Sequence, residues 1–555
     1  MKTRIGIVAL MAGISSAAVA QSQYDVIRFM DNELNGTARF VGMGGAMGAL
    51  GADLSTMSTN PAGIGMYRSN DVALTFGFNA NHSNADLGGI VSKEKRTKAS
   101  FDQIGFVWSN KIGNKTNLRY VNFGFNYRKR ANFNRQFSSA GGFSDGASLS
   151  WQMADMLWQA EDGVGHYYNT LGDFNDLLDA GFKGSKLGDP YTDSYFYGTP
   201  YLSSMGARTG LLDPLLAEGS LLDDPEAKLI GFLPWNSDGH QYYSREEGGV
   251  EEYDFNLSFN VQDRYYFGVT VGAYSLNYNR YSSYGENIVD GEAKGNFTLN
   301  NWYKQEGTGF DVKLGAIIRP FEYSPFRIGF SIHTPIWYSV TEYHTATLTA
   351  GATSFPEGTQ YTENLSDYLN PEYVWDYRLT TPWRFGVSMG TIVSGMMALD
   401  AEYEYAKYSS AHLEDVDGYE LNGTTAVNES LKGVHTFRVG METKLTSAFS
   451  MRAGYNFQSS PIHEDSFKNI PFTDETRTDA EYLNLKSRQA VTFGMGYRGR
   501  LFYADVAYKY DFYKANFYAF GKANFYAFGS SDIELPATKV NNERHQVLFT
   551  LGVHF

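Results

Sequence analysis

Strict alternation of apolar and polar side chains recurs along most of the chain. In residues 253–263, YDFNLSFNVQD, every second residue from Tyr253 to Val261 is apolar, and those between are polar. Successive side chains of a β-strand point to opposite faces. The segment therefore predicts a strand with one apolar and one polar face.

The same pattern occurs fourteen times. The apolar rows span residues 72–78, 104–108, 121–127, 253–261, 265–271, 310–318, 328–332, 385–389, 399–405, 437–441, 451–457, 491–497, 502–508 and 547–555. Repeated two-faced segments separated by turns are typical of transmembrane barrels, and bacterial single-chain barrels have an even number of strands. We therefore predict an all-β membrane protein, a 14-stranded antiparallel transmembrane β-barrel formed by residues 71–555.

The connections alternate between long and short, as expected for loops at one rim and tight turns at the other. The long ones are roughly 83–98, 136–249, 283–308, 345–371, 410–431, 459–486 and 515–540; the short ones include QDRY, TIVSG and KLTSA. The longest, 136–249, is predicted to be extracellular. It carries a helical apolar stripe from Leu149 to Ala160 and a second apolar piece, 211–222. It could pack on itself over the barrel mouth or receive an apolar ligand.

The tandem KANFYAFG copies, 514–521 and 522–529, are expected in a surface loop.

The N-terminus has the pattern of a secretory signal peptide over residues 1–20. Lys2 and Arg4 precede an apolar run, and Ala18-Val19-Ala20 fits a cleavage site. The chain has no cysteine, and beyond the N-terminus it has no apolar run long enough for a transmembrane helix. Loss of Lys2 and Arg4 would change the net charge from −15 to −17, which disfavours nucleic acid as a partner. The expected location is the outer membrane of a Gram-negative cell.

The polar faces of the predicted strands carry charges of both signs. On the lipid side each charge would cost about 2–4 kcal/mol near the midplane, so we expect them to face the lumen. Two interpretations remain open: a charged, partly filled lumen, or pairs that only brace the wall. The residues are Lys313, Arg327, Arg384, Asp400, Glu402, Glu404, Arg438, Glu442, Arg452, Arg498, Asp505 and Lys509.

Residues 21–70 precede the first strand and lack its alternation. They are rich in Gly and Met, and neither G-x-G-x-x-G nor G-K-[ST] is complete, so nucleotide binding is not indicated. Glycines and small side chains allow close packing, and Asn60-Pro61 favours a turn. We predict a plug, or hatch, inside the barrel.

This segment resembles the N-terminal hatch of the FadL/TodX family of outer-membrane transporters of long-chain fatty acids and other hydrophobic compounds. Further segments, among them SIHTPIWYS and TPWRFGVSMG, are similar to Bacteroidetes-type members. The resemblance implies a monomeric fourteen-stranded barrel whose ligand leaves sideways through the wall. It implies a gating role for the Asn60–Gly63 block, and our candidate for the wall opening is the third strand, where alternation falters after Tyr127. The matching hatch residues are Gly42, Gly44, Gly45, Ala46, Asp53, Ser55, Asn60, Pro61, Ala62 and Gly63.

The expected function is therefore uptake of long-chain fatty acids or other hydrophobic small molecules, with outer-membrane lipid and the barrel-insertion machinery as further partners. The final Phe555 resembles the C-terminal aromatic residue that this machinery uses. The alternative is a haemin-binding receptor, because His and Tyr can ligate haem, although the ten histidines show no close cluster in the sequence. No G-x-S-x-G elbow or other catalytic set stands out, so we expect no enzyme, no cofactor and no metal site. An open porin is disfavoured by the hatch.

Overall fold

Fourteen strand positions make up the wall of the barrel in the computed structural model. Residues 22–143, 146–159, 168–181, 187–196, 198–355, 359–369, 371–468, 476–521 and 535–555 are described; the predicted signal peptide, 1–20, lies outside them. The wall strands are β1 (Asp71–Leu87), β2 (Ile90–Lys111), β3 (Leu118–Asn132) continued by β4 (Arg135–Gly141), β7 (Asn236–Val261), β8 (Tyr265–Asp290), β9 (Ala293–Ile318), β10 (Arg327–His333) continued by β11 (Trp337–Ala352), β13 (Tyr373–Thr380) continued by β14 (Arg384–Val393), β15 (Met397–Lys407), β17 (Gly433–Lys444), β18 (Phe449–Gln458), β19 (Tyr482–Arg498), β20 (Phe502–Tyr518) and β21 (Thr538–His554).

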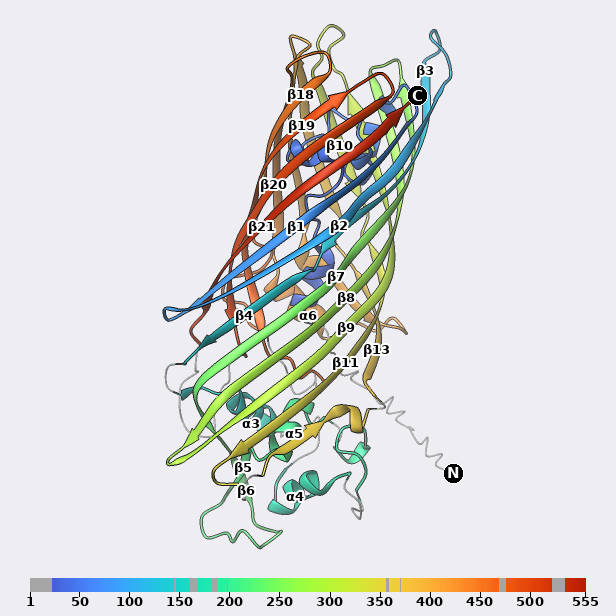
Figure 1. The fold of residues 1–555 in the computed structure, drawn as a ribbon. Helices are drawn as coiled ribbons and strands as arrows, with labels where there is room; N and C mark the ends of the chain where they lie inside the picture. Colours follow the sequence, from blue (N-terminus) through green and yellow to red (C-terminus); the bar gives the residue numbers. More distant parts are fainter. Residues whose placement is uncertain are drawn as a thin grey trace, which may run out of the picture.

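The sheet closes on itself through its first and last strands. Strand β1 pairs antiparallel with β21, from Asp71 opposite His554 to Asp86 opposite Lys539, and every other pair of neighbouring wall strands is also antiparallel. Because β1 and β21 pair with each other, neither terminal strand of the sheet has an unpaired edge. The predicted fourteen-stranded antiparallel barrel is confirmed (Figure 1).

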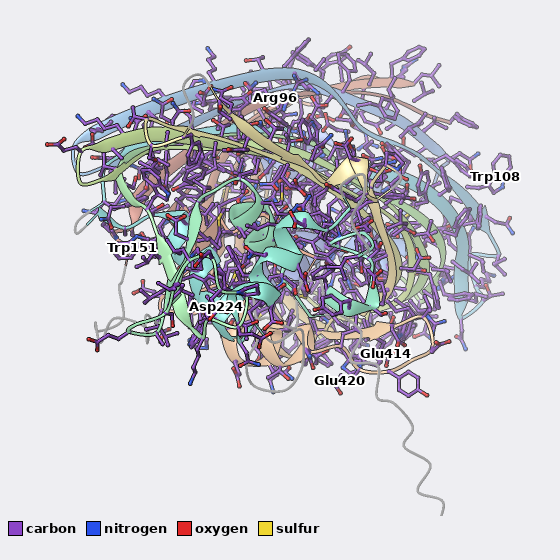
Figure 2. The ribbon with its side chains drawn as sticks, turned by 90° about the horizontal axis from the view of Figure 1, so that it is seen from below. Arg96, Trp108, Trp151, Asp224, Glu414 and Glu420 are labelled. Atoms are coloured by element: carbon purple, nitrogen blue, oxygen red, sulfur yellow. The ribbon has the colours of Figure 1, made fainter. Side chains whose placement is uncertain are left out.

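The two faces of the wall have the predicted polarity. Phe255 and Val439 are 50% and 49% exposed on the outside, whereas Arg438, next in the chain to Val439, is 6% exposed in the lumen. Viewed from the end that carries the loops, Trp108 points away from the barrel (Figure 2). An apolar outer band around a polar interior is the pattern of an outer-membrane barrel, and the chain belongs in that membrane.

The wall strands extend well beyond the apolar band. Strands β7, β8 and β9 each have 26 residues, and their outer faces become polar past Tyr253, with Asn277 and Lys304 among the residues there. The predicted loops 83–98 and 283–308 are therefore wrong, because they are mostly strands that end in tight hairpins. The outer face of these extensions meets water instead of lipid, so its side chains need not be apolar. The first KANFYAFG copy likewise lies largely in β20, not in a loop, and the second lies outside the described residues.

The long connection between β4 and β7 folds into a cap over one rim (Figure 1). It contains α3 (Leu149–Gln159), α4 (Leu171–Asp179), η5 (Ser194–Phe196), α5 (Tyr201–Arg208), β5 (Leu212–Leu216) and β6 (Leu229–Pro234). Apolar residues of the helices, including Met153 and Leu202, pack with wall residues such as Phe297 in one buried cluster. The cap thus packs on itself and on the wall, although Leu222 is 78% exposed. Strand β7 begins at Asn236, so the connection is shorter than the predicted 136–249.

The N-terminal segment, residues 22–70, lies inside the barrel (Figure 1). It forms α1 (Gln23–Met30), α2 (Ala38–Gly42), η1 (Leu54–Ser58) and η2 (Pro61–Met66), and most of its residues are buried. The remaining short elements, β12 (Tyr361–Asn364), η6 (Leu365–Asp367), η7 (Tyr408–Ser410), β16 (His412–Asp415) and α6 (Gly423–Ser430), lie toward the cap rim. Among the described residues, no helix is both long and apolar enough to span a bilayer.

Candidate functional site: the filled lumen and the cavity above it

Glycines of the wall provide the surface on which the Asn60–Gly63 block lies. A Cβ on Gly268 of β8 would stand 2.4 Å from the Pro61 carbonyl carbon, and one on Gly315 of β9 would stand 2.1 Å from Asn60 Oδ1. Gly268 and Gly315 are direct partners in the β8–β9 ladder. Only a wall without side chains at these positions allows so close an approach.

Polar groups fix this block in place. Asn60 caps η2 by accepting from the Ala62 amide at 3.2 Å, and its Nδ2 donates to the Gly48 carbonyl at 2.7 Å. Ser258 of β7 donates to the Pro61 carbonyl at 2.9 Å. Gly63 packs on the Thr56 side chain, which leaves no space for a Cβ. The block is thus bonded both to the wall and within the N-terminal segment.

The other predicted hatch residues have separate positions in the same segment. Gly42 ends α2, and its carbonyl accepts from Thr492 of the wall at 3.2 Å. Gly44 and Gly45 follow with φ of +65° and +81°, and the Gly44 carbonyl accepts from Asn456 at 3.3 Å.

Asp53 and Ser55 connect the parts of the segment to each other. The Asp53 carboxylate accepts from the Ser55 amide at 2.9 Å and from the Thr37 hydroxyl. The Ser55 hydroxyl accepts from the Thr37 amide at 2.9 Å and donates to Gln103 of β2 at 3.0 Å. These bonds join α2 to η1 and η1 to the wall.

Acidic residues of β15 hold the backbone of the N-terminal segment. Asp400 accepts from the amides of Ala49 and Leu50 at 3.1 and 2.9 Å, and Glu402 accepts from the Gly48 amide at 3.1 Å. Hydrogen bonds to a charged acceptor are among the stronger ones in proteins. These two predicted lumen charges therefore anchor the segment as well as the wall.

The basic residues of the predicted network do not all pair with acids. Arg438 forms ion pairs with Glu402 and, at 3.3 Å, with Glu404, and Arg384 lies 4.0 Å from Glu404. Arg327 instead donates to the Leu50 carbonyl at 2.9 Å. The network includes both wall-to-wall pairs and bonds to the segment.

A second set of predicted charges meets α2. Glu442 accepts from Arg39 of α2 at 2.8 Å and from Arg452 at 2.6 Å, and Arg452 also pairs with Asp505 of β20. The chain from Arg39 to Asp505 crosses β17, β18 and β20. Both wall-to-wall ion pairs and ion pairs to the N-terminal segment thus occur among these residues.

Lys313 lies at the centre of a cluster of charged residues. From the sequence, only Lys313 itself was predicted to face the lumen. Its Nζ is 2.6 Å from Glu252, 2.5 Å from Asp254 and 3.3 Å from Asp311, and all four side chains are 0% exposed. Arg128 adds a 2.6 Å pair to Glu252. The cluster joins β3, β7 and β9 at mid-wall.

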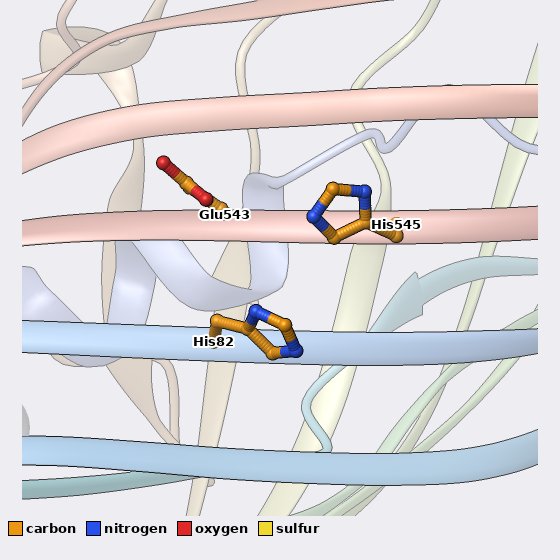
Figure 3. Close-up of side chains that lie close together, drawn as sticks. All are labelled: His82, Glu543 and His545. Atoms are coloured by element: carbon orange, nitrogen blue, oxygen red, sulfur yellow. The ribbon is translucent and has the colours of Figure 1, made fainter.

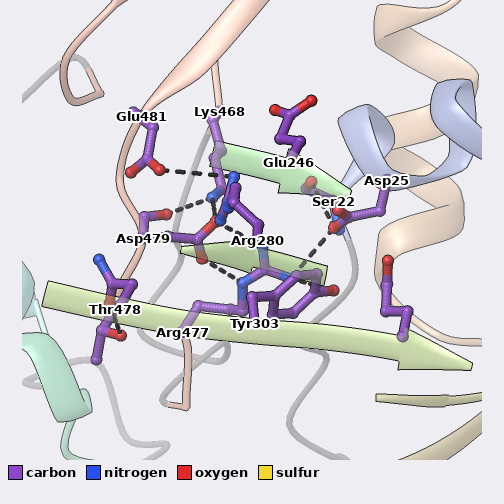
Figure 4. Close-up of polar contacts among 12 residues, drawn as sticks. Ser22, Asp25, Glu246, Arg280, Tyr303, Lys468, Arg477, Thr478, Asp479 and Glu481 are labelled. Atoms are coloured by element: carbon purple, nitrogen blue, oxygen red, sulfur yellow. Dashed lines mark hydrogen bonds and ion pairs between the residues drawn. The ribbon is translucent and has the colours of Figure 1, made fainter. Parts of the chain in front are cut away.

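On the cap side of these contacts, α1 is bonded to the loop that leads into β19 (Figure 4). Arg477 donates to Asp25 of α1 at 3.1 Å and to Asp479 at 2.5 Å. Asp479 also pairs with Lys468 at 3.0 Å and with Arg280 of β8. We call Asp25, Arg280, Lys468, Arg477 and Asp479 the latch.

The latch combines three cationic and two acidic side chains, and all of them except the half-buried Arg280 are buried. Burial raises the pKa of Asp25, but Arg477 and then Arg28 outweigh it and hold that pKa below its ordinary range. Burial opposes ionisation of Asp479 as well, and Arg477, Lys468 and Arg280 hold its pKa well below the usual value. Both carboxyls are therefore ionised at neutral pH.

A cavity of about 230 Å³ lies beside α1, between the latch and the wall. Its apolar lining includes Ile27, Phe133 and Phe137, and its polar lining includes Arg135 and Arg280. The Nε of each of these two arginines is buried and has no hydrogen-bond partner among the described residues. The cavity thus offers apolar surface and two unpaired Nε–H donors, although both guanidinium groups also pair with acids, Arg135 with Glu246 and Arg280 with Asp479.

The backbone ladder of the wall is interrupted next to this cavity. Strands β2 and β3 pair only from Lys111 opposite Tyr120 to Gln103 opposite Arg128. Residues 90–101 of β2 pair with β1 alone, while β4 pairs with β7 alone. Within the described residues no ladder joins the two sides, and we call this interruption the wall gap.

The gap has a local cause in the sequence of the third strand. A bulge falls between Lys129 and Ala131, and Arg128 and Arg130 are both buried. Because alternation then fails, the strand turns away from β2 at Phe133 and resumes as β4. The guanidinium of Arg96 crosses the gap and donates to the Glu246 carbonyl at 2.7 Å.

The structure brings together two histidines that show no proximity in the sequence. His82 of β1 and His545 of β21 have ring centroids 5.5 Å apart on the outer wall. In the interior, His333 and His344 lie 2.8 and 2.5 Å from the carbonyls of Thr59 and Thr476, and His240 stacks on Phe143 at 4.3 Å. Only the strand register of the closed barrel, which the sequence alone does not provide, could have revealed the outer pair.

Comparison with solved structures finds the same architecture. A FadL homologue from Pseudomonas aeruginosa aligns with a TM-score of 0.51 and 12% identity over 95% of this chain and 99% of that chain. The toluene transporters TodX of P. putida and TbuX of Ralstonia pickettii score 0.46 and 0.42, with 11% and 13% identity, over 94% of this chain and 99% of each of theirs. Of these TM-scores only the first exceeds 0.5, and the likeness to the FadL homologue supports the barrel fold and nothing more. No family model and no curated protein matches the chain.

Proposed function

We propose that this chain, which has the fold of the FadL homologue, takes up hydrophobic small molecules across the outer membrane and belongs with the FadL/TodX transporters. One observation carries the proposal. A cavity with apolar and cationic lining lies beside the wall gap, on the cap side of the filled lumen. The largely buried N-terminal segment lies in the lumen. An apolar solute can leave through the wall.

The ligand class follows from the lining of the cavity. A long-chain fatty acid has a carboxylate for the unpaired Nε–H groups of Arg135 and Arg280, beside their ion pairs to Glu246 and Asp479, and a chain for the apolar lining. Each buried CH₂ contributes about 0.8 kcal/mol in apolar surroundings. Lateral release keeps the chain in such surroundings, whereas an aqueous pore would not.

The N-terminal segment acts as the plug in this mechanism. Deletion of residues 42–65 removes the wall contacts of the Asn60–Gly63 block and of Gly42 and Gly44. We expect ion conductance in planar bilayers to rise and uptake of labelled oleate to be lost. Unchanged conductance in the deletion would remove the plug role.

Ligand class is tested on the full-length protein. Mass spectrometry of co-purified lipids and uptake of oleate, toluene and haemin by the same cells distinguish the candidates. We expect unlabelled oleate to compete with the uptake of labelled oleate, and we expect this competition to be lost in Arg280→Gln. Saturable haemin binding with a Soret shift and no oleate competition would favour the haemin receptor instead.

A further inference from the structure

Three side chains on the outer wall form a cluster that transport does not use. His82 comes from β1, and Glu543 and His545 come from β21 (Figure 3). In the β1–β21 ladder His82 is directly opposite Glu543. One ligand-type atom from each of the three residues lies within 4.8 Å of the other two. Among the described residues this is the one group of its kind.

The cluster lies just beyond the apolar band, on the side of the cap. The outward apolar row of β1 ends at Phe78, and that of β21 starts at Val547. All three side chains are partly exposed, so ions in the external medium can reach them. Lys95, opposite His82 on β2, is the one basic side chain next to it in the ladders, and Glu543 offsets its charge.

The imidazole nitrogens are available and oriented. His82 Nε2 is buried and has no hydrogen-bond partner among the described residues. His545 Nδ1 lies 2.7 Å from the Tyr508 hydroxyl, which leaves its Nε2 for another partner. In the tautomer whose Nδ1–H donates to this hydroxyl, the Nε2 lone pair is free for a metal, and such a hydrogen bond orients a metal-binding histidine.

We propose that His82, Glu543 and His545 bind a divalent transition-metal ion of the Zn²⁺ class. Two imidazoles and one carboxylate form a donor set that Zn²⁺ accepts, with water in a fourth position. Separations of up to 4.8 Å require small side-chain rotations to meet bonds of about 2.0–2.2 Å. Tyr508 is a positioning residue.

The position of the site gives the metal a structural consequence. Strands β1 and β21 are the first and last of the wall, and their ladder is the seam that closes the barrel. An ion bound by both strands cross-links that seam. A ligand that binds only the folded state raises its stability by mass action, so Zn²⁺ raises the melting temperature of the barrel.

The test uses the full-length barrel, folded in detergent and freed of metal by chelation. Isothermal titration with Zn²⁺ gives a stoichiometry of one, and Co²⁺ gives visible d–d bands. His82→Asn and His545→Asn each weaken Zn²⁺ binding by at least about tenfold and abolish the melting-temperature shift. Glu543→Gln weakens it less, because the amide oxygen remains.

His435→Asn is the matched control. His435 also faces outward and has a tyrosine partner, with Nδ1 2.9 Å from the Tyr403 hydroxyl, but it belongs to no cluster of ligands. Zn²⁺ binding is unchanged in this variant. Heat-modifiable migration on gels confirms that each variant is folded. Equal Zn²⁺ affinity in wild type and His82→Asn, or no stoichiometric binding by wild type, overturns the proposal.

Discussion

Gly454 of the barrel wall lies against Gly44 of the N-terminal segment so closely that a Cβ on Gly454 would stand 2.1 Å from the Gly44 amide nitrogen. Gly268 bears the same relationship to Pro61 on the β8 side. Two bare patches in the wall therefore receive two turns of one segment. The fit fixes where the segment lies against the wall.

Gly268→Val tests this fit. The new side chain would overlap the backbone of Pro61, so we expect the Asn60–Gly63 block to leave the wall and the single-channel conductance to rise. Gly285→Ala, also on β8, is the control because its Cβ would meet only ordinary contacts at 3.5 Å or more. Equal conductance in the two variants would show that the block does not seal the lumen there.

Lys313→Met addresses the buried cluster of β7 and β9. The substitution leaves Glu252, Asp254 and Asp311 with no lysine between them, and breaking a buried ion pair typically costs about 3–5 kcal/mol. We expect a loss of that order in the free energy of unfolding by urea. Lys304→Met, on the outer face of β9 and 41% exposed in its pair with Glu306, should change it by less than about 1 kcal/mol.

The latch gives a pH dependence whose sign follows from the lowered pKa of Asp25. A carboxyl whose folded-state pKa lies below its unfolded value of about 3.9 stabilises the fold at higher pH and loses this effect as pH falls through the folded pKa. Amide exchange of α1, corrected for intrinsic rate, should thus be equally slow at pH 7 and pH 5.

Arg477→Gln removes the largest contribution that lowers the pKa of Asp25. Burial is then opposed less, so we expect that pKa to rise above its unfolded value. Ionising the buried carboxyl then costs stability as pH rises, so α1 should exchange faster at pH 7 than at pH 5. Arg245→Gln, whose 2.8 Å pair with Glu247 is on the exposed outer wall, should leave α1 unchanged. Equally slow exchange in Arg477→Gln would mean that apolar packing alone holds α1.

The sequence was sufficient for the parts of the fold that the membrane dictates. A wall strand faces lipid on one side and polar groups on the other, so apolar and polar side chains must alternate along it. The outward apolar rows, such as Phe255 to Val261, could therefore be predicted directly from the sequence. The extensions of β7 to β9 could not, because in water either face of a strand can be polar. The strand disturbance after Tyr127 was visible, since consecutive charges break the alternation.

Contacts between distant segments were beyond the sequence. Asp400 and Glu402 were predicted to face the lumen, but their bonds to the amides of residues 48–50 depend on how the N-terminal segment lies. The latch joins α1 to a loop more than four hundred residues away. The proximity of His82 and His545 requires the closing register of β1 and β21, which no local pattern specifies.

The wall gap can be tested at Phe133, because the chain has no cysteine of its own. Phe133 lines the cavity, joins β3 to β4, and packs edge-on against Tyr278 at 5.5 Å. In Phe133→Cys, a bulky maleimide would occupy the route between cavity and gap. We expect labelling to reduce oleate uptake by more than tenfold; a reduction of this order corresponds to about 1.4 kcal/mol. Labelled Lys304→Cys, on the outer wall, should transport normally. If labelled Phe133→Cys transported as well as the unlabelled variant, the ligand would have to leave by another route, along the axis past the plug.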